Sequence, residues 1–86
     1  MKPLSKVRRR VVSRAEIEIA ALEDVREAER WERQGGHLEA ARLYIDAALR
    51  CSALGQRSAA LAAMTNATRA LGREADTIVV PVERAS

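Results

Sequence analysis

The sequence predicts an all-α fold, a three-helix arrangement that runs up, down and up and includes an antiparallel hairpin. Apolar residues recur at spacings of three and four in three separate stretches, which is the period of an amphipathic helix. Glycines stand where each stretch ends, and short connections favour antiparallel neighbours. With 86 residues the chain is one domain at most. We expect a flexible basic N-terminal arm (1–12), a helical domain (13–72) and an extended C-terminal tail (73–86).

The first helix is expected from about Ala15 to Arg33. The segment that begins at Ser13 has the form of a capping box, in which the Ser13 hydroxyl accepts from the amide of Glu16 and the Glu16 side chain accepts from the amide of Ser13. Gly35-Gly36 ends this helix, because glycine adopts the left-handed conformation without steric cost. The apolar stripe, flanked by Leu22 and Trp31 and with Ile19 on the opposite side, is Ile17, Ala21, Val25 and Ala28.

The second helix is expected from about His37 to Cys51 and the third from about Gln56 to Leu71, with Gly55 and Gly72 as their C-terminal caps. Leu43 is expected to point away from the core. The stripe of the second helix, with Leu49 at its edge, is Leu38, Ala41, Tyr44, Ile45, Ala48 and Cys51. The stripe of the third, with Leu61 beside it, is Ala60, Met64, Ala67 and Leu71.

Positive charge is concentrated at the N-terminus. The first 14 residues carry six cations and no acid, whereas the remainder carries nine arginines and twelve acids, which gives +3 overall. Such an arm attracts phosphates without reading bases, although it holds no aromatic side chain to stack on them. A solvated tail and a contact with an acidic protein are the other interpretations. The six cations are Lys2, Lys6, Arg8, Arg9, Arg10 and Arg14.

The β-branched segment 77–82 has extended character, and Pro81 within it argues against a central strand. Three interpretations stay open: the segment drapes over the helices, is disordered, or pairs with a strand of another chain.

The Gly-turn and second helix resemble the latter half of a tetratricopeptide repeat, which places a turn glycine, a small inserted residue and an aromatic–Ala–Leu ending at these spacings. The resemblance implies a helical hairpin whose second helix approaches the first closely at Ala41. The first helix departs from the pattern at Glu29 and Glu32, where that family prefers apolar or small residues. The matching residues are Gly36, Leu38, Ala41, Tyr44, Ile45, Ala48 and Leu49.

A second resemblance covers residues 25–70. The acidic-apolar helix, the glycine turn, the Ala40-Ala41-Arg42 segment and the aromatic Tyr44 resemble the PerC/ANR-type small bacterial transcriptional regulators. That resemblance implies a regulator of transcription, and some such proteins act by binding other regulators, including nucleoid-associated ones. The lone cysteine and the lack of a secretory signal separately favour a bacterial cytoplasmic protein. Tyr44 stands where that family commonly has Trp.

Nothing in the sequence indicates an enzyme, a cofactor or a metal site. His37 is the single histidine and lies beside a glycine turn, and Cys51 falls on an apolar stripe, where a thiol is buried rather than nucleophilic. A lone cysteine excludes an intramolecular disulfide, and neither a membrane-spanning run nor a secretory signal is evident.

The favoured hypothesis is therefore a small non-enzymatic protein–protein interaction module that modulates transcription by binding another regulator. One alternative is direct nucleic-acid binding through the basic arm, and another is a phage- or plasmid-borne inhibitor of a host protein. Because an alanine-rich core is lean, a homodimer is a further way to bury surface. The predicted protein-binding residues are Ile19, Leu22, Trp31, Leu43 and Tyr44.

Overall fold

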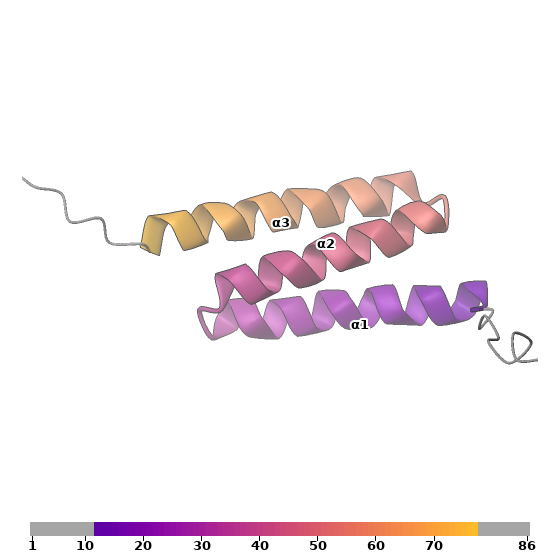
Figure 1. Cartoon of the computed structure of the whole chain (residues 1–86), viewed down its shortest axis with the longest axis horizontal. Coiled ribbons are helices and arrows are strands. Elements are labelled where there is room, and N and C mark those ends of the chain that lie inside the picture. Colours follow the sequence, from indigo (N-terminus) through magenta and orange to yellow (C-terminus); the bar gives the residue numbers. More distant parts are fainter. Residues whose placement is uncertain (1–11, 78–86) are drawn as a thin grey trace, which may run out of the picture.

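The computed structural model of the chain describes residues 12–77, and over that range the predicted all-α, three-helix fold is confirmed. The helices are α1 (Arg14–Arg33), α2 (His37–Ala53) and α3 (Arg57–Thr77). They lie side by side in up-down-up order (Figure 1), and α2 packs against both α1 and α3. The basic residues 1–11 and the segment 78–86 lie outside the described residues, so the predictions about them stay predictions.

The start of α1 is the predicted capping box. The Glu16 amide donates to Ser13 Oγ at 3.1 Å, and the Ser13 amide donates to Glu16 Oε1 at 3.1 Å. Two amides that would otherwise lack a partner are thereby satisfied. The helix begins at Arg14, one residue earlier than predicted.

Both turns between helices use the same device. Gly35 and Gly55 have φ of 84° and 77°, the left-handed region that favours glycine. At the first turn, the amides of Gly35 and Gly36 donate to the carbonyls of Glu32 and Trp31 at 3.0 and 2.8 Å, which is a Schellman motif. The second turn repeats this pattern around Gly55. Two matching three-residue turns therefore produce the antiparallel order that the sequence predicted.

The predicted end of the third helix is wrong. Gly72 does not cap α3, which continues to Thr77, so residues 73–77 are helical and do not belong to the extended tail. Gly72 lacks the positive φ of the two turn glycines. A glycine inside a helix costs only about 1 kcal/mol relative to alanine, which neighbouring helical residues offset.

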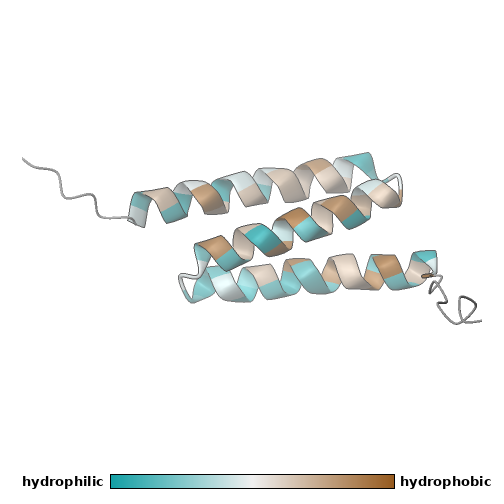
Figure 2. Ribbon diagram, viewed as in Figure 1, coloured by the Kyte–Doolittle hydropathy of each residue, from teal (hydrophilic) through white to brown (hydrophobic). Residues whose placement is uncertain are grey.

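Alanine dominates the core. Nine of the twelve buried hydrophobic residues in the described part of the chain are alanines, and the other three are Tyr44, Cys51 and Leu54. Figure 2 accordingly shows strongly hydrophobic residues spread over all three helices. The buried alanines are Ala21, Ala28, Ala40, Ala41, Ala47, Ala48, Ala63, Ala67 and Ala70.

Several large residues lie elsewhere than predicted. Met64 and Leu71 were expected in the core stripe of the third helix but are exposed, because α3 turns its alanine face towards α2. Leu38 of α2 is exposed as well. Leu43 was expected to point away, yet it is half-buried and packs against the core cluster. Small side chains allow close approach of helix backbones, and this packing displaces the bulkier residues.

Enlarging a buried alanine should therefore destabilise the protein. Ala41 of α2 is 1% exposed, so the larger leucine side chain has no room in the packed core. Ala41→Leu is therefore expected to lower the free energy of unfolding by about 1–3 kcal/mol. Urea unfolding followed by circular dichroism measures this change. The same substitution at exposed Ala15 is the matched control and should leave stability within about 0.5 kcal/mol. Equal losses at both positions would contradict the close-packed alanine interface.

Candidate functional site

An apolar groove runs between α1 and α3, with α2 as its floor. It encloses about 410 Å³, and the buried Cys51 of α2 lies at its base. All three helices contribute to the groove, because α1 and α3 both pack on α2. A channel remains between α1 and α3 where their side chains are small. The lining residues are Glu18, Ala21, Leu22, Val25, Cys51, Gln56, Ala59 and Ala63.

The polar side chains of this groove are paired with each other. Gln56 Nε2 donates to Glu18 Oε2 at 3.1 Å and so connects the start of α3 to α1. The remaining lining residues are apolar. Leu22, one of them, is 59% exposed. A groove with an exposed leucine on one wall suits the insertion of an apolar side chain from another helix.

A second, more open groove lies between α1 and α2. It encloses about 520 Å³, but three charged residues line it. Its lower enclosure and higher charge make it a weaker apolar site than the groove between α1 and α3. The lining residues are Val12, Glu16, Ile17, Ala20, Asp46, Leu49, Arg50 and Ala53.

The predicted protein-binding residues do not form one surface. Leu22 lines the groove between α1 and α3, and Ile19 is exposed on the same helix, about 60° further round it. Trp31 and Leu43 instead line a shallow depression of about 240 Å³ between α1 and α2. The sequence offered no signal for the contribution of Gln56, Ala59 and Ala63, because the expected core stripe of the third helix, of which only Ala67 is buried, does not include them.

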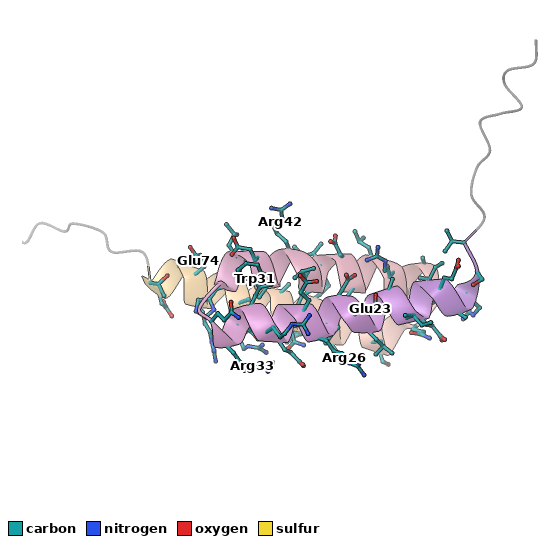
Figure 3. The ribbon with its side chains drawn as sticks, turned by 90° about the horizontal axis from the view of Figure 1, so that it is seen from below. Glu23, Arg26, Trp31, Arg33, Arg42 and Glu74 are labelled. Carbon is teal, nitrogen blue, oxygen red and sulfur yellow. The ribbon has the colours of Figure 1, made fainter. Side chains whose placement is uncertain are left out.

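Trp31 is partly exposed and also packs against the first turn. It is 37% exposed, near the end of α1 that leads into the turn (Figure 3). Its ring covers Gly36 so closely that a Cβ there would lie 2.5 Å from Trp31 Cε3. The tryptophan therefore explains why the second turn glycine is needed although Gly36 has an ordinary negative φ of −85°.

Tyr44 is excluded from the contact surface, because it is 2% exposed in the core. Its hydroxyl donates to Glu32 Oε1 at 3.0 Å, and Arg69 Nη2 donates to Glu32 Oε1 and Oε2 at 2.8 and 3.0 Å. The Arg69 guanidinium carbon lies 6.0 Å from the centre of the Tyr44 ring. One carboxylate of α1 thus joins α2 and α3.

This cluster changes the acidity of its members. Burial alone would raise the pKa of Glu32, but the hydrogen bonds from Arg69 and Tyr44 outweigh it and lower that pKa. Burial, together with the adjacent Glu32 carboxylate, raises the pKa of Tyr44. The carboxylate form of Glu32 is therefore the form that the fold stabilises.

A second ion pair behaves differently. Arg50 contacts the carboxylate of Asp24 and joins α2 to α1. Burial nevertheless raises the pKa of Asp24, and the neighbouring acids Asp46 and Glu27 add to that effect, so Arg50 compensates only part of the cost.

One cation of the predicted nucleic-acid-binding set has a structural partner. Arg14 Nη2 donates to the carbonyl of Leu54 at 2.9 Å, at the C-terminal cap of α2. A cation there donates a hydrogen bond to a carbonyl at the helix end and interacts favourably with the negative end of the helix dipole. The other five, Lys2, Lys6, Arg8, Arg9 and Arg10, lie outside the described residues.

Within residues 12–77, no three His, Cys, Asp or Glu side chains gather where they would hold a metal ion. None of the described helices combines the length and apolar character needed to cross a membrane.

No family model, no curated protein and no solved structure matches the chain.

Replacing Glu32 tests whether its carboxylate joins the helices. Glu32→Gln should lower the free energy of unfolding at neutral pH by about 1–2 kcal/mol, because it removes charged hydrogen bonds from a side chain that is 13% exposed. The lowered pKa means that this contribution is present above the ordinary value of 4.5 and is lost as the pH falls through the folded-state pKa.

The difference between wild type and Glu32→Gln should therefore shrink in acid, as measured by urea unfolding at a series of pH values. Exposed Glu29 on the same helix provides the matched control, and Glu29→Gln should show no such trend. A difference that stays constant from neutral pH into acid would contradict the role assigned to Glu32.

Proposed function

We propose that this protein is a non-enzymatic interaction module that binds a basic amphipathic helix of another protein, and that through this contact it modulates transcription. The observation that carries the proposal is the apolar groove between α1 and α3, walled by the exposed Leu22. Grooves of this kind accept a helix through apolar side chains spaced three or four residues apart.

The charge of α1 specifies the chemistry of the partner. This helix carries seven acids against four arginines, and one of these acids, Glu18, lines the groove. An occupant with cationic residues flanking its apolar stripe would gain attraction that increases the association rate and fixes the orientation. A partner with an acidic helix would be disfavoured for the same reason.

The regulatory part of the proposal is supported by the resemblance of residues 25–70 to PerC/ANR-type regulators. The resemblance favours a transcriptional or nucleoid-associated protein as the partner, and the charge of α1 favours a partner with a basic helix. A regulator that has such a helix meets both conditions. Contact through the groove requires no base-reading helix in the chain itself.

The Leu22→Glu variant is the direct test. Immobilised wild-type protein is expected to enrich a partner from the native host, and a synthetic peptide with that partner's basic helix should bind in fluorescence anisotropy. Leu22→Glu should weaken peptide binding at least about tenfold, because it places a charge on the apolar wall.

Leu49→Glu is the matched control, since Leu49 is 64% exposed, close to the 59% of Leu22, but lines the other groove. The peptide should bind Leu49→Glu and a variant lacking residues 1–11 as it binds wild type. Equal loss with Leu22→Glu and Leu49→Glu, or binding that depends only on residues 1–11, would refute the groove as the binding site.

A further inference from the structure

The outward side of α3 carries an apolar stripe that no other described part of the chain covers. Leu61, Met64 and Leu71 are 63%, 44% and 45% exposed, and Thr68 stands between them at the same helical spacing. We call these four residues the α3 stripe. Helical geometry of about 100° per residue places the stripe away from Ala59 and Ala63, so it is separate from the groove between α1 and α3.

Most of the stripe lies in a stretch of α3 without charged residues. No charged residue occurs between Arg57 and Arg69, which is three turns of helix. The Thr68 hydroxyl donates to the carbonyl of Met64 at 3.0 Å, so its polar atom is already satisfied. The stripe is therefore a continuous apolar strip.

Gly72 provides an independent observation. It lies inside α3, where glycine weakens a helix relative to alanine. A Cβ added there would meet nothing within 4 Å, so packing within the described chain does not require glycine. A glycine at an exposed helical position leaves room for the backbone of another helix to approach closely.

We propose that the α3 stripe binds the α3 stripe of a second copy of the chain, with the two helices antiparallel around a two-fold axis. The spacing of the stripe supports this arrangement. From Arg57 through the stripe to Ala75 the steps are four, three, four, three and four residues, which read the same in both directions. Reversal thus sets Leu61 against Leu71 of the second copy and Met64 against Thr68 of the second copy.

The charges at the two ends of α3 select the antiparallel orientation. Arg57 stands at the N-terminus, and Glu74 and Asp76 lie near the C-terminus, with Arg73 beside them. Arg57, Glu74 and Asp76 each oppose the dipole of their own helix, whereas Arg73 does not. An antiparallel neighbour places Arg57 beside the acidic end of the other copy, where both charges become favourable, whereas a parallel neighbour would bring like charges together.

The size of the contact sets its strength. One helix face against another buries less area than a standard stable interface, so the dimer is expected to dissociate in the micromolar range. Sedimentation equilibrium of the full chain, from low micromolar to near-millimolar concentration, should show a monomer–dimer equilibrium. A monomer throughout this range would overturn the proposal.

Substitutions in the stripe test its location. Leu61→Glu and Leu71→Glu should each weaken dimerisation at least about tenfold while leaving the helical content unchanged, since both side chains are exposed in the monomer. Leu22→Glu, on the groove, is the matched control and should dimerise as wild type does. Dimerisation that survives both stripe variants, or that Leu22→Glu abolishes, would overturn the assignment.

Disulfide trapping tests the orientation, in a Cys51→Ala background that removes the native thiol. Leu61→Cys and Leu71→Cys should form a mixed disulfide dimer when the two variants are combined and little when each is oxidised alone. Efficient trapping of Leu61→Cys with itself would show a parallel pair and overturn the arrangement. Gly72→Leu should weaken the dimer, whereas Gly72→Ala should raise the monomer's melting temperature.

Discussion

The structure depends on one packing constraint: α2 lies between α1 and α3 and presents alanines to both. Alanine lets two helix backbones approach closely, but each alanine buries little apolar area. The core of the described region is consequently tight and thin, with Tyr44 as its largest fully buried side chain. The same constraint moves the larger aliphatic residues to the periphery, and their exposure at Leu22, Leu61 and Leu71 creates the surfaces on which both proposals rest.

Alanine faces are alike, so they define the register between helices weakly, and polar contacts supply the missing specificity. Glu32 accepts hydrogen bonds from Tyr44 and Arg69 and so fixes the three helices at one end of the bundle. Gln56 and Glu18 make a corresponding link between α1 and α3 at the other end. The groove lies between these two links. Because the walls are held at both ends, an occupant would meet a largely preformed channel and lose less free energy in ordering it.

Local signals in the sequence predicted the local structure well. The capping box at Ser13 and the turn glycines Gly35 and Gly55 each act through backbone chemistry that involves only a few neighbouring residues, and all three have their predicted roles. The orientation of α3 was not predictable in this way. A helix with alanines on several faces can bury more than one of its sides. Hydrophobicity alone favours burial of Met64 and Leu71, whereas close packing of the helices buries Ala63, Ala67 and Ala70. The cluster around Glu32 also depends on residues 12 and 37 positions apart, which no local pattern reveals.

The two proposed surfaces use different sides of α3, and this separation has a physical consequence. The groove takes Gln56, Ala59 and Ala63, whereas the stripe takes Leu61, Met64 and Leu71, so a second copy on the stripe leaves the groove open. A two-fold dimer would then carry two grooves. A partner that is itself oligomeric, or that presents two basic helices, would engage both, and the second contact would form at the high effective concentration set by the dimer. A weak dimer and a weak groove would in this way produce tight binding to a multivalent regulator and little binding to an isolated helix.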